Sequence, residues 1–501
     1  MKYTNPVKRG FFPDPSIIRV GDDYYMVNST FQYFPAIVIS HSKDLVHWEI
    51  IGHAITENSY LDLSEILDSR GIWAPDISYC NGKYYIFATL RYNYTPEDKK
   101  PMRVQLVMWS DKPEGPYSKP TLIDVDNIDP SHFVDDDGKH YMVIAPGVCI
   151  VPLNEDCTER TGEPLQVWEG TGERCPEGPH IFKKDGYYYA LVAAGGTGYG
   201  HGIVMARSKN IEGPYESSPY NPILRQTDEN APIQRSGHGK FVKAEDGSWW
   251  CTYLCGRQNE GKYTTLGRET ALDRVHWFED GWCVVGDGTP SLTAQAPDIP
   301  QKMYESKTYF DFKESIPLEF QWVRNPDYSL IDFKDGLSLK ASEDNVDSIK
   351  CKNILLHREE ELKYNASLSI KADNLEDAHC GLICYYSTVS YIRFSLKEGF
   401  LELVINRNRG EEVITQKPFE KKEVCLCVET RGQKRTFYIE ENGKKEYFAS
   451  VDKCIFLCDE GVPDDPKRHT GTLVGMYIVS KKNKKAVMNV NYFKYENITG
   501  E

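Results

Sequence analysis

One short pattern recurs five times in the first half of the chain. Each copy has a Pro- or Gly-rich approach with a polar residue, an apolar run, a turn containing Gly, and then aromatic residues. Such a copy is typical of a β-hairpin, with two alternating strands joined by a tight turn. The five copies are Phe12–Val27, Ala74–Ala88, Ile128–Ala145, Pro176–Ala193 and Ser236–Leu254.

The spacing of the copies predicts their arrangement in space. The turn glycines follow one another at intervals of 48 to 61 residues, which is long enough for a four-stranded blade with its loops. Helical periodicity is almost absent. The sequence therefore predicts an all-β fold in which residues 1–290 form a five-bladed β-propeller. The glycines are Gly21, Gly82, Gly138, Gly186 and Gly247.

The repeat ends before a segment that is rich in Pro and small residues. We expect residues 291–304 to be a linker. Beyond it, runs such as 401–405 and 436–440 alternate between apolar and polar residues without the propeller repeat. The sequence therefore predicts that residues 305–501 form a second domain, a β-sandwich.

Charge and composition narrow the classes of partner. The net charge of −15 repels nucleic acid and anionic membrane surfaces, so we expect neither as a partner. No apolar stretch resembles a signal peptide or a membrane span, and the fourteen cysteines lack an export signal, which predicts reduced thiols and a cytoplasmic protein.

The repeat also predicts where a functional site lies. Inner strands of a propeller surround one axis, so the polar residues that open them meet at a common mouth. Crowded carboxyl groups raise each other's pKa, and one of them can then stay protonated as a general acid. The converging residues are Asp14, Asp76, Asp129, Glu177 and His238.

This set of groups suits hydrolysis of a glycosidic bond. That reaction needs an acid to protonate the leaving oxygen and a carboxylate to activate water or to attack the anomeric carbon. Phe31, Phe34 and Trp73 lie beside the same strand starts and could stack on a sugar ring. The sequence does not give the carboxylate separation, so inversion and retention both stay open at this point.

Several motifs resemble glycoside hydrolase family 43, specifically its β-xylosidases and α-L-arabinofuranosidases with a C-terminal β-sandwich. The resemblance spans nearly the whole chain. It implies that the sandwich is concanavalin-like and that hydrolysis proceeds with inversion. The motifs lie at residues 11–16, 71–76, 128–131, 177–180, 195–198 and 267–270.

The resemblance also implies roles for individual residues. Asp14 resembles the general base, Glu177 the general acid, and Asp129 the residue that raises the pKa of the acid and orients the sugar. Phe31 and Trp73 resemble the walls of the terminal-sugar subsite. The remaining substrate-binding candidates are Asp76, Thr197, His238 and Arg268.

Further expectations follow from the family. His238 resembles the axial histidine of the family, which contacts calcium in some members, so calcium in the central channel is a candidate. The resemblance implies no required cofactor. A sandwich loop at residues 461–469 is expected to close the pocket, and this chain carries Arg468 and His469 there. Family members of this architecture imply a homo-oligomer, a dimer or a tetramer.

Some motifs have simpler explanations than a ligand site. The Asp135, Asp136 and Asp137 triplet lacks calcium-loop spacing and precedes a hairpin glycine, so it indicates a solvated turn. The Gly-rich segment 195–202 is not followed by a helix, which favours a pocket-edge loop over phosphate binding. Glu173 echoes a motif of retaining fructosidases, but the companion motif is absent, so we interpret it as a loop residue.

The hypothesis is therefore an inverting exo-glycoside hydrolase that releases terminal xylose from xylo-oligosaccharides and also cleaves α-L-arabinofuranosides. The alternatives are a predominant α-L-arabinofuranosidase, a retaining fructosidase-like enzyme, and a propeller that binds sugar without cleaving it. All three candidate catalytic carboxyl groups, at Asp14, Asp129 and Glu177, are present, which disfavours the binding-only alternative.

Overall fold

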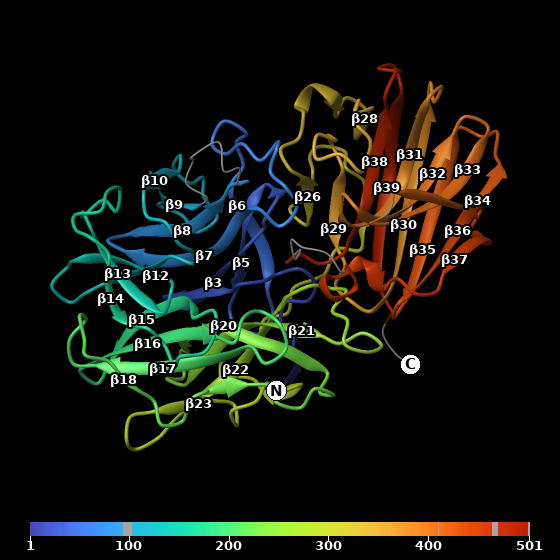
Figure 1. The fold of residues 1–501 in the computed structure, drawn as a ribbon. Coiled ribbons are helices and arrows are strands. Elements are labelled where there is room, and N and C mark those ends of the chain that lie inside the picture. The colour runs from blue at the N-terminus through green and yellow to red at the C-terminus, as the bar shows by residue number, and fades with distance from the viewer. Residues whose placement is uncertain (94–102, 409, 463–468, 499–501) are drawn as a thin grey trace.

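The computed structural model describes residues 1–93, 103–408, 410–462 and 469–498 (Figure 1). Within these residues the chain forms strands and three 3-10 helices, η1 (Tyr328–Leu330), η2 (Ile455–Leu457) and η3 (Asp459–Gly461). No helix in this described part is long and apolar enough to cross a membrane. The predicted all-β class is confirmed.

The first domain has five antiparallel sheets, which we name blades I to V in chain order. Blade IV carries a fifth strand, β19 (Leu224–Arg225), which pairs with β17. The strands are, for blade I, β2 (Ser16–Val20), β3 (Asp23–Asn28), β5 (Ala36–Ser42) and β6 (Glu49–Ile55); for blade II, β7 (Gly71–Cys80), β8 (Lys83–Arg91), β9 (Arg103–Ser110) and β10 (Thr121–Ile123); for blade III, β11 (Ser131–Val134), β12 (His140–Ile144), β13 (Val148–Leu153) and β14 (Leu165–Trp168); for blade IV, β15 (Glu177–Lys184), β16 (Tyr187–Ala194), β17 (Gly202–Ser208) and β18 (Glu216–Ser217); and for blade V, β20 (Ile233–Lys243), β21 (Trp249–Arg257), β22 (Glu269–Trp277) and β23 (Cys283–Val285).

The five blades close into a ring. The first strands β2, β7, β11, β15 and β20 each contact the next, and β20 contacts β2. Each sequence repeat forms the first hairpin of its blade, and the five turn glycines all have positive φ, between 62° and 82°. Outside the blades, β1 (Lys2–Thr4) pairs with β24 (Thr293–Gln295), so part of the segment that we expected to be a linker ties the ring to the N-terminus.

The second domain is a sandwich of two sheets (Figure 1). Leu382, Phe394, Leu426 and Phe437 lie in the apolar core between them. One sheet runs β27 (Ile331–Asp332), β28 (Ser338–Lys340), β39 (Val487–Asn497), β30 (Lys363–Asp373), β35 (Glu423–Arg431), β36 (Lys434–Glu441) and β37 (Lys444–Val451), with β25 (Tyr309–Phe310) on β39. The other runs β34 (Glu411–Pro418), β33 (Phe400–Arg407), β32 (Ser390–Lys397), β31 (Ala378–Ser387), β38 (Leu473–Ser480), β29 (Leu355–Arg358), β26 (Phe320–Val323) and β4 (Tyr33–Phe34).

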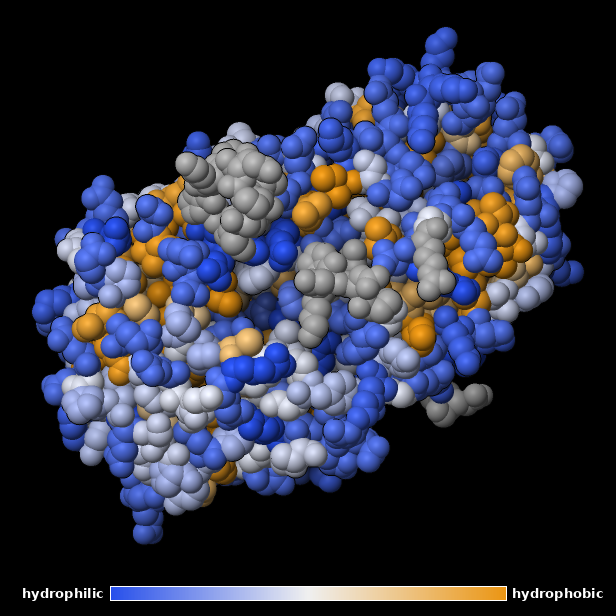
Figure 2. Space-filling view, viewed as in Figure 1, coloured by the Kyte–Doolittle hydropathy of each residue, from blue (hydrophilic) through white to orange (hydrophobic). Residues whose placement is uncertain are grey.

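The last strand of that sheet, β4, comes from the propeller. It extends the sandwich sheet by pairing with β26, where Phe34 lies opposite Trp322. Two buried ion pairs also cross the interface, Arg324 to Asp68 and Arg235 to Asp459, each at 2.9 Å. This junction fixes the sandwich against the end of the propeller at which the inner strands begin. Hydrophilic residues cover most of the visible face of both domains (Figure 2).

Candidate active site

A cavity of about 300 Å³ opens where the inner strands begin. All three candidate catalytic residues line it. Asp14 and Asp129 each lie two residues before an inner strand, β2 and β11, and Glu177 is the first residue of β15. Equivalent positions of three blades therefore supply three carboxyl groups to one space. The other lining residues are Phe31, Trp73, Ala74, Ile128, Arg174, Cys175, Gly196, Thr197, Gly198, His238, Arg268 and His469.

The backbone at these positions is unusual. Asp14, Phe31, Asp129 and His238 all have positive φ, between 49° and 59°, which is uncommon for residues other than glycine. Gly178, directly after Glu177, also has positive φ, and a Cβ atom there would lie 2.7 Å from the His238 ring. Such conformations persist only where the surrounding structure holds them, and they concentrate at functional sites.

Asp14 is held in its ionised form. Its Oδ1 accepts a hydrogen bond from Arg268 Nη1 at 2.9 Å, and its Oδ2 accepts one from the Ser29 hydroxyl at 2.6 Å. Burial of the carboxyl group works against ionisation, but the charge of Arg268 and the hydrogen bond from Ser29 lower the pKa of Asp14 below its ordinary value. Asp14 is thus a carboxylate that can accept a proton.

Glu177 has the opposite tendency. Burial and the negative charge of Asp14 raise the pKa of Glu177 to about 7. Burial, Glu177 and Asp14 also raise the pKa of Asp129. The backbone N–H of Gly178 donates to Asp129 Oδ2 at 3.0 Å, which favours the charged form of Asp129 and offsets part of this rise. The cavity therefore holds a protonated carboxyl group facing a stable carboxylate.

Arg268 links several parts of the cavity. Besides Asp14, its guanidinium donates to the Thr197 hydroxyl at 3.4 Å and to the His469 carbonyl at 3.3 Å. The guanidinium also lies 5.4 Å from the centre of the Phe31 ring. Thr197 comes from the Gly-rich loop between β16 and β17, which confirms that this loop borders the pocket. A planar cation in this place can hold both a carboxylate and sugar hydroxyl groups.

Three rings form one wall of the cavity. The Phe31 and Trp73 centroids are 6.2 Å apart, and His469 lies 6.3 Å from Phe31 and 6.1 Å from Trp73. His469 precedes β38 in the second domain, so the sandwich contributes directly to the pocket. Burial, then the nearby arginines, lower the pKa of His469 to about 3, so its ring is neutral. Arg468 lies outside the described residues.

The structure differs from the expectation at Asp76. This residue does not line the cavity, because it is the sixth residue of β7 and therefore lies further along its strand than Asp14, Asp129 and Glu177, whereas Ala74, two residues earlier, does line the cavity. It is buried, with Oδ1 at 2.6 Å from Lys240 Nζ and Oδ2 accepting from the His132 backbone N–H at 2.9 Å. Because its oxygens are satisfied within the protein, Asp76 joins blades II, III and V rather than facing a sugar.

Two lining residues, Arg174 and Cys175, escaped sequence reasoning because they lie in a connecting loop with no repeat signal. Glu173, beside them, points elsewhere and pairs with Arg225 at 2.7 Å. Asp136 and Asp137 are exposed, in agreement with a solvated turn, whereas the mostly buried Asp135 binds Lys183 and Tyr188.

The surroundings of His238 do not suit calcium. Ca²⁺ takes six to eight oxygen ligands. The imidazole Nδ1 lies 3.6 Å from Asp14 Oδ1, and that carboxylate already binds Arg268 and Ser29. Burial lowers the pKa of His238, so it stays neutral. Among the described residues no group of three or more metal-binding side chains includes His238.

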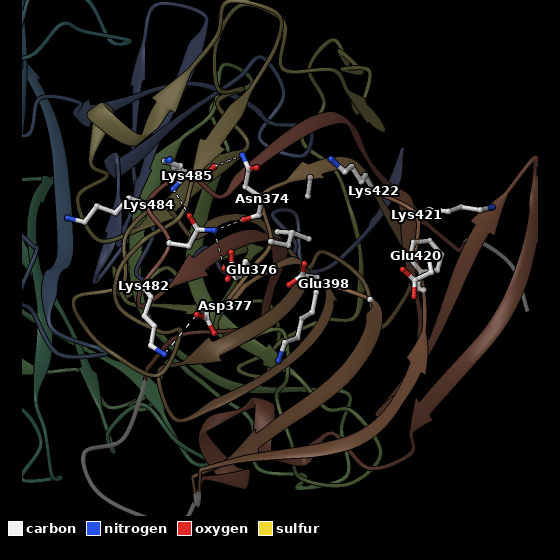
Figure 3. A pocket seen from close by; sticks show the side chains of 16 residues that line it. Asn374, Glu376, Asp377, Glu398, Glu420, Lys421, Lys422, Lys482, Lys484 and Lys485 are labelled. Carbon is white, nitrogen blue, oxygen red and sulfur yellow. Dashed lines mark hydrogen bonds and ion pairs between the residues drawn. The ribbon is translucent and has the colours of Figure 1, made fainter.

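A larger hollow of about 900 Å³ lies at one end of the sandwich (Figure 3). Its lining contains both lysines and acidic residues, and Lys482 faces Asp377 at 3.9 Å. Lys422, another lining residue, binds Asp373. These side chains are exposed and spread apart, whereas the propeller cavity brings buried carboxyl groups together. The propeller cavity is therefore the candidate active site.

Comparison with known proteins agrees with this geometry. The sequence model of glycosyl hydrolases family 43 matches residues 3–283. The model of the β-xylosidase C-terminal concanavalin A-like domain matches residues 308–496. The predicted boundaries at 290 and 305 fall between these two matches.

Individual relatives cover the whole architecture. The crystal structure of a family 43 protein from Bacillus licheniformis is 50% identical, has a TM-score of 0.96, and covers 99% of this chain and 100% of its own. A β-xylosidase of Bacillus subtilis is 32% identical over 99% of this chain and 100% of its own length. A non-reducing end α-L-arabinofuranosidase of Bacteroides ovatus is 36% identical over 84% of this chain and 79% of its own length. The chain belongs to glycosyl hydrolase family 43 and is a glycosidase with a concanavalin A-like second domain.

Proposed function

We propose that this protein is an inverting exo-β-xylosidase, with Glu177 as general acid and Asp14 as general base. The observation that carries the proposal is the opposite pKa shift of two carboxyl groups in one cavity, with that of Glu177 raised to about 7 and that of Asp14 lowered. Pairs of carboxyl groups whose environments separate their pKa values divide the acid and base roles between them.

The two groups act in one displacement. Glu177 gives its proton to the glycosidic oxygen as the bond from that oxygen to the anomeric carbon breaks. A water molecule attacks the same carbon from the opposite face and loses a proton to Asp14. Asp14 gains one proton and Glu177 loses one, so solvent must return the pair to its starting state. No covalent intermediate forms, and the configuration of the anomeric carbon inverts.

Neighbouring residues support both roles. We propose that Asp129, which lines the same cavity and repels a second negative charge there, helps to keep Glu177 protonated and orients the sugar. Arg268 orients the Asp14 carboxylate and remains able to bind sugar hydroxyl groups. Thr197 and His238 line the same cavity and are proposed to contact the terminal sugar.

The shape of the cavity favours attack at chain ends. Its volume of about 300 Å³ is at the lower limit of ordinary ligand pockets. Phe31, Trp73 and His469 wall one side, where their rings can pack on a sugar face. A closed wall leaves no continuous groove for a polysaccharide, so we propose that one terminal residue enters at a time.

The glycone assignment rests on the relatives. β-Xylosidases match this chain over nearly its full length, which supports xylose. The arabinofuranosidase from Bacteroides ovatus has the higher identity, 36%, and this supports α-L-arabinofuranosidase activity as a second candidate. Fourteen free cysteines support a reducing compartment, and we propose a cytoplasmic homo-oligomer acting on imported xylo- or arabino-oligosaccharides.

Paired assays on 4-nitrophenyl β-D-xylopyranoside and 4-nitrophenyl α-L-arabinofuranoside test the glycone. We expect the xyloside to give the higher kcat/KM and the arabinofuranoside to be cleaved more slowly. Brief treatment with EDTA should change neither rate, because we propose that the catalytic pocket needs no metal. A higher kcat/KM on the arabinofuranoside would favour the second candidate, and failure to cleave either substrate would refute both.

The pH dependence follows from the two pKa shifts. Glu177 must be protonated and its pKa is about 7, so kcat/KM on xylobiose should fall as the pH rises through about 7. Asp14 must be ionised and its pKa lies below its ordinary value, so the rate should hold well below pH 5 until the protein itself unfolds. Initial rates from pH 3 to 10 measure both limbs, and a rate that rises above neutral pH would contradict the assignment.

A further inference from the structure

Two cysteines and two histidines meet between blades II and III, away from the residues that line the catalytic cavity. Cys80 is the last residue of β7, His132 lies in β11, and His140 is the first residue of β12. Cys157 lies in the turn that follows β13. His132, His140 and Cys157 are buried, whereas Cys80 is partly exposed. We refer to these four residues as the Cys/His cluster.

Three ligand atoms of the cluster form a small triangle. His132 Nε2 is 3.0 Å from His140 Nδ1. Cys157 Sγ is 3.2 Å from His140 Nδ1 and 3.5 Å from His132 Nε2. Cys80 Sγ and one ring nitrogen of each histidine lie within 4.8 Å of one another. Both thiols therefore lie near the same two imidazole rings.

Strand pairing explains how the histidines come together. His132 lies opposite Met142 and His140 lies opposite Val134, so the two histidines are diagonal neighbours on one face of the β11–β12 hairpin. Since β7 packs against β11, the end of β7 brings Cys80 to the same face. The cluster thus follows from the packing of adjacent blades.

Cys157 is held inward by an otherwise exposed turn. Its neighbours Glu155, Asp156 and Glu159 are exposed, but Cys157 itself has no exposed surface and a positive φ of 57°. The Asn154 side chain fixes this turn by accepting hydrogen bonds from the backbone N–H groups of Thr158 and Glu159, at 2.8 and 3.1 Å. An uncommon backbone conformation is therefore kept in a turn that directs a thiol at two imidazoles.

The second nitrogen of His132 has its own partner. Nδ1 lies 2.7 Å from the Ser78 hydroxyl, and the ring stacks on Phe87 with centroids 4.8 Å apart. A partner on one ring nitrogen fixes the tautomer and the direction of the other nitrogen, as metal-binding histidines require. His132 Nε2 is thereby directed toward Cys157 and His140, and it offers a lone pair in the tautomer in which Nδ1–H donates to the Ser78 hydroxyl.

We propose that the Cys/His cluster binds one Zn²⁺ ion as a structural site of the propeller. Two cysteines and two histidines are a standard ligand set for tetrahedral zinc. Zinc–ligand bond lengths place such ligands roughly 3.4 Å apart for two nitrogens and roughly 3.5 Å apart for nitrogen and sulfur. The three short distances in the cluster approach these values. Cys80 Sγ lies within 4.8 Å of one nitrogen of each histidine, and it must move closer to complete the set.

Charge favours zinc in this buried place. Each thiol loses its proton to solvent on binding, and two thiolates neutralise Zn²⁺ while the imidazoles stay neutral. The site then carries no net charge, which limits the cost of burying the ion. Cys80 supplies the partly exposed side from which the ion can enter. The bound zinc ion is expected to fasten blade II to blade III. This structural effect is separate from sugar hydrolysis.

Metal analysis of the intact wild-type protein is the first test. Protein produced with zinc in the medium and passed through a metal-free desalting column should contain about one zinc ion per chain. After removal of the ion with dipicolinate under reducing conditions, Co²⁺ alone should give the visible absorption bands and thiolate charge-transfer band of a tetrahedral site. The melting temperature should fall on removal and recover when Zn²⁺ is added back.

Variants locate the ion. Cys157→Ala and His140→Ala should each retain less than about a tenth of the wild-type zinc. Two controls should retain all of it. Cys283→Ala removes a buried propeller cysteine whose Sγ contacts Met205, and Cys425→Ala disrupts the other group of metal-binding side chains among the described residues, Cys425, Cys427 and Glu440.

Each outcome decides the matter. Stoichiometric zinc that is lost in the two cluster variants and kept in both controls supports the proposal. Zinc that disappears only in Cys425→Ala places the ion on the sandwich and overturns it. If the wild-type protein holds no zinc and gives no Co²⁺ spectrum, the proposal is overturned and no variant is needed. The cluster is then a set of hydrogen-bonded thiols and imidazoles.

Discussion

Replacement of Glu177 by Gln is expected to reduce kcat on xylobiose by about 10²–10⁴-fold, since the amide cannot protonate the leaving sugar. The loss should depend on the leaving group. Dinitrophenolate departs without a proton, so kcat on 2,4-dinitrophenyl β-D-xyloside should fall by less than about tenfold. The alkaline fall in rate, which the raised pKa of Glu177 explains, should also disappear on that substrate.

Glu173→Gln is the matched control for this prediction. Glu173 lies four residues away in the same loop region, but it pairs with Arg225 and does not line the cavity. Its substitution should leave kcat on both substrates near the wild-type value. Equal losses on xylobiose and on the dinitrophenyl substrate in Glu177→Gln would contradict the role of general acid.

The Asp14→Asn variant should lose about 10²–10⁴-fold in kcat on both substrates alike. The activation of water does not depend on the leaving group, so a better leaving group cannot compensate. The amide also weakens the contact with Arg268, which leaves a buried guanidinium with less compensation, so we expect a lower melting temperature.

Asp135→Asn serves as the control for Asp14→Asn, because Asp135 binds Lys183 and does not line the cavity. It should retain wild-type rates. Kinetics of Asp14→Asn are to be measured well below its melting temperature, so that unfolding does not contribute. A variant that keeps activity on the dinitrophenyl substrate would show that Asp14 is not the base.

Repetition made most of this fold predictable. Each copy of the pattern carries its own turn glycine, so five weak hairpin signals support one another and specify a ring. The ring in turn explains why residues as distant in sequence as Asp14, Asp129 and Glu177 share one cavity. The alternation of polar and apolar residues was sufficient to predict a β-sandwich. That the sandwich is concanavalin-like was predicted only from the family resemblance.

Features that depend on packing between segments were less accessible. Asp76 occupies the place of a pocket residue in the sequence repeat. In the structure, however, its Oδ1 lies 2.6 Å from Lys240 Nζ of another blade, and this buried ion pair is away from the cavity. The pairing of β4 with β26 joins segments nearly three hundred residues apart, and no local sequence pattern predicts it. The Cys/His cluster has no motif spacing either, because its members come from three strands and a turn.

The anomer released first tests the central claim most directly. Proton NMR can follow 4-nitrophenyl β-D-xylopyranoside with enough enzyme to finish hydrolysis before mutarotation. An inverting displacement by water, with Asp14 as base and Glu177 as acid, predicts α-xylose as the first product, followed by slow appearance of the β anomer. Initial release of β-xylose would mean retention through a covalent intermediate and would contradict this account.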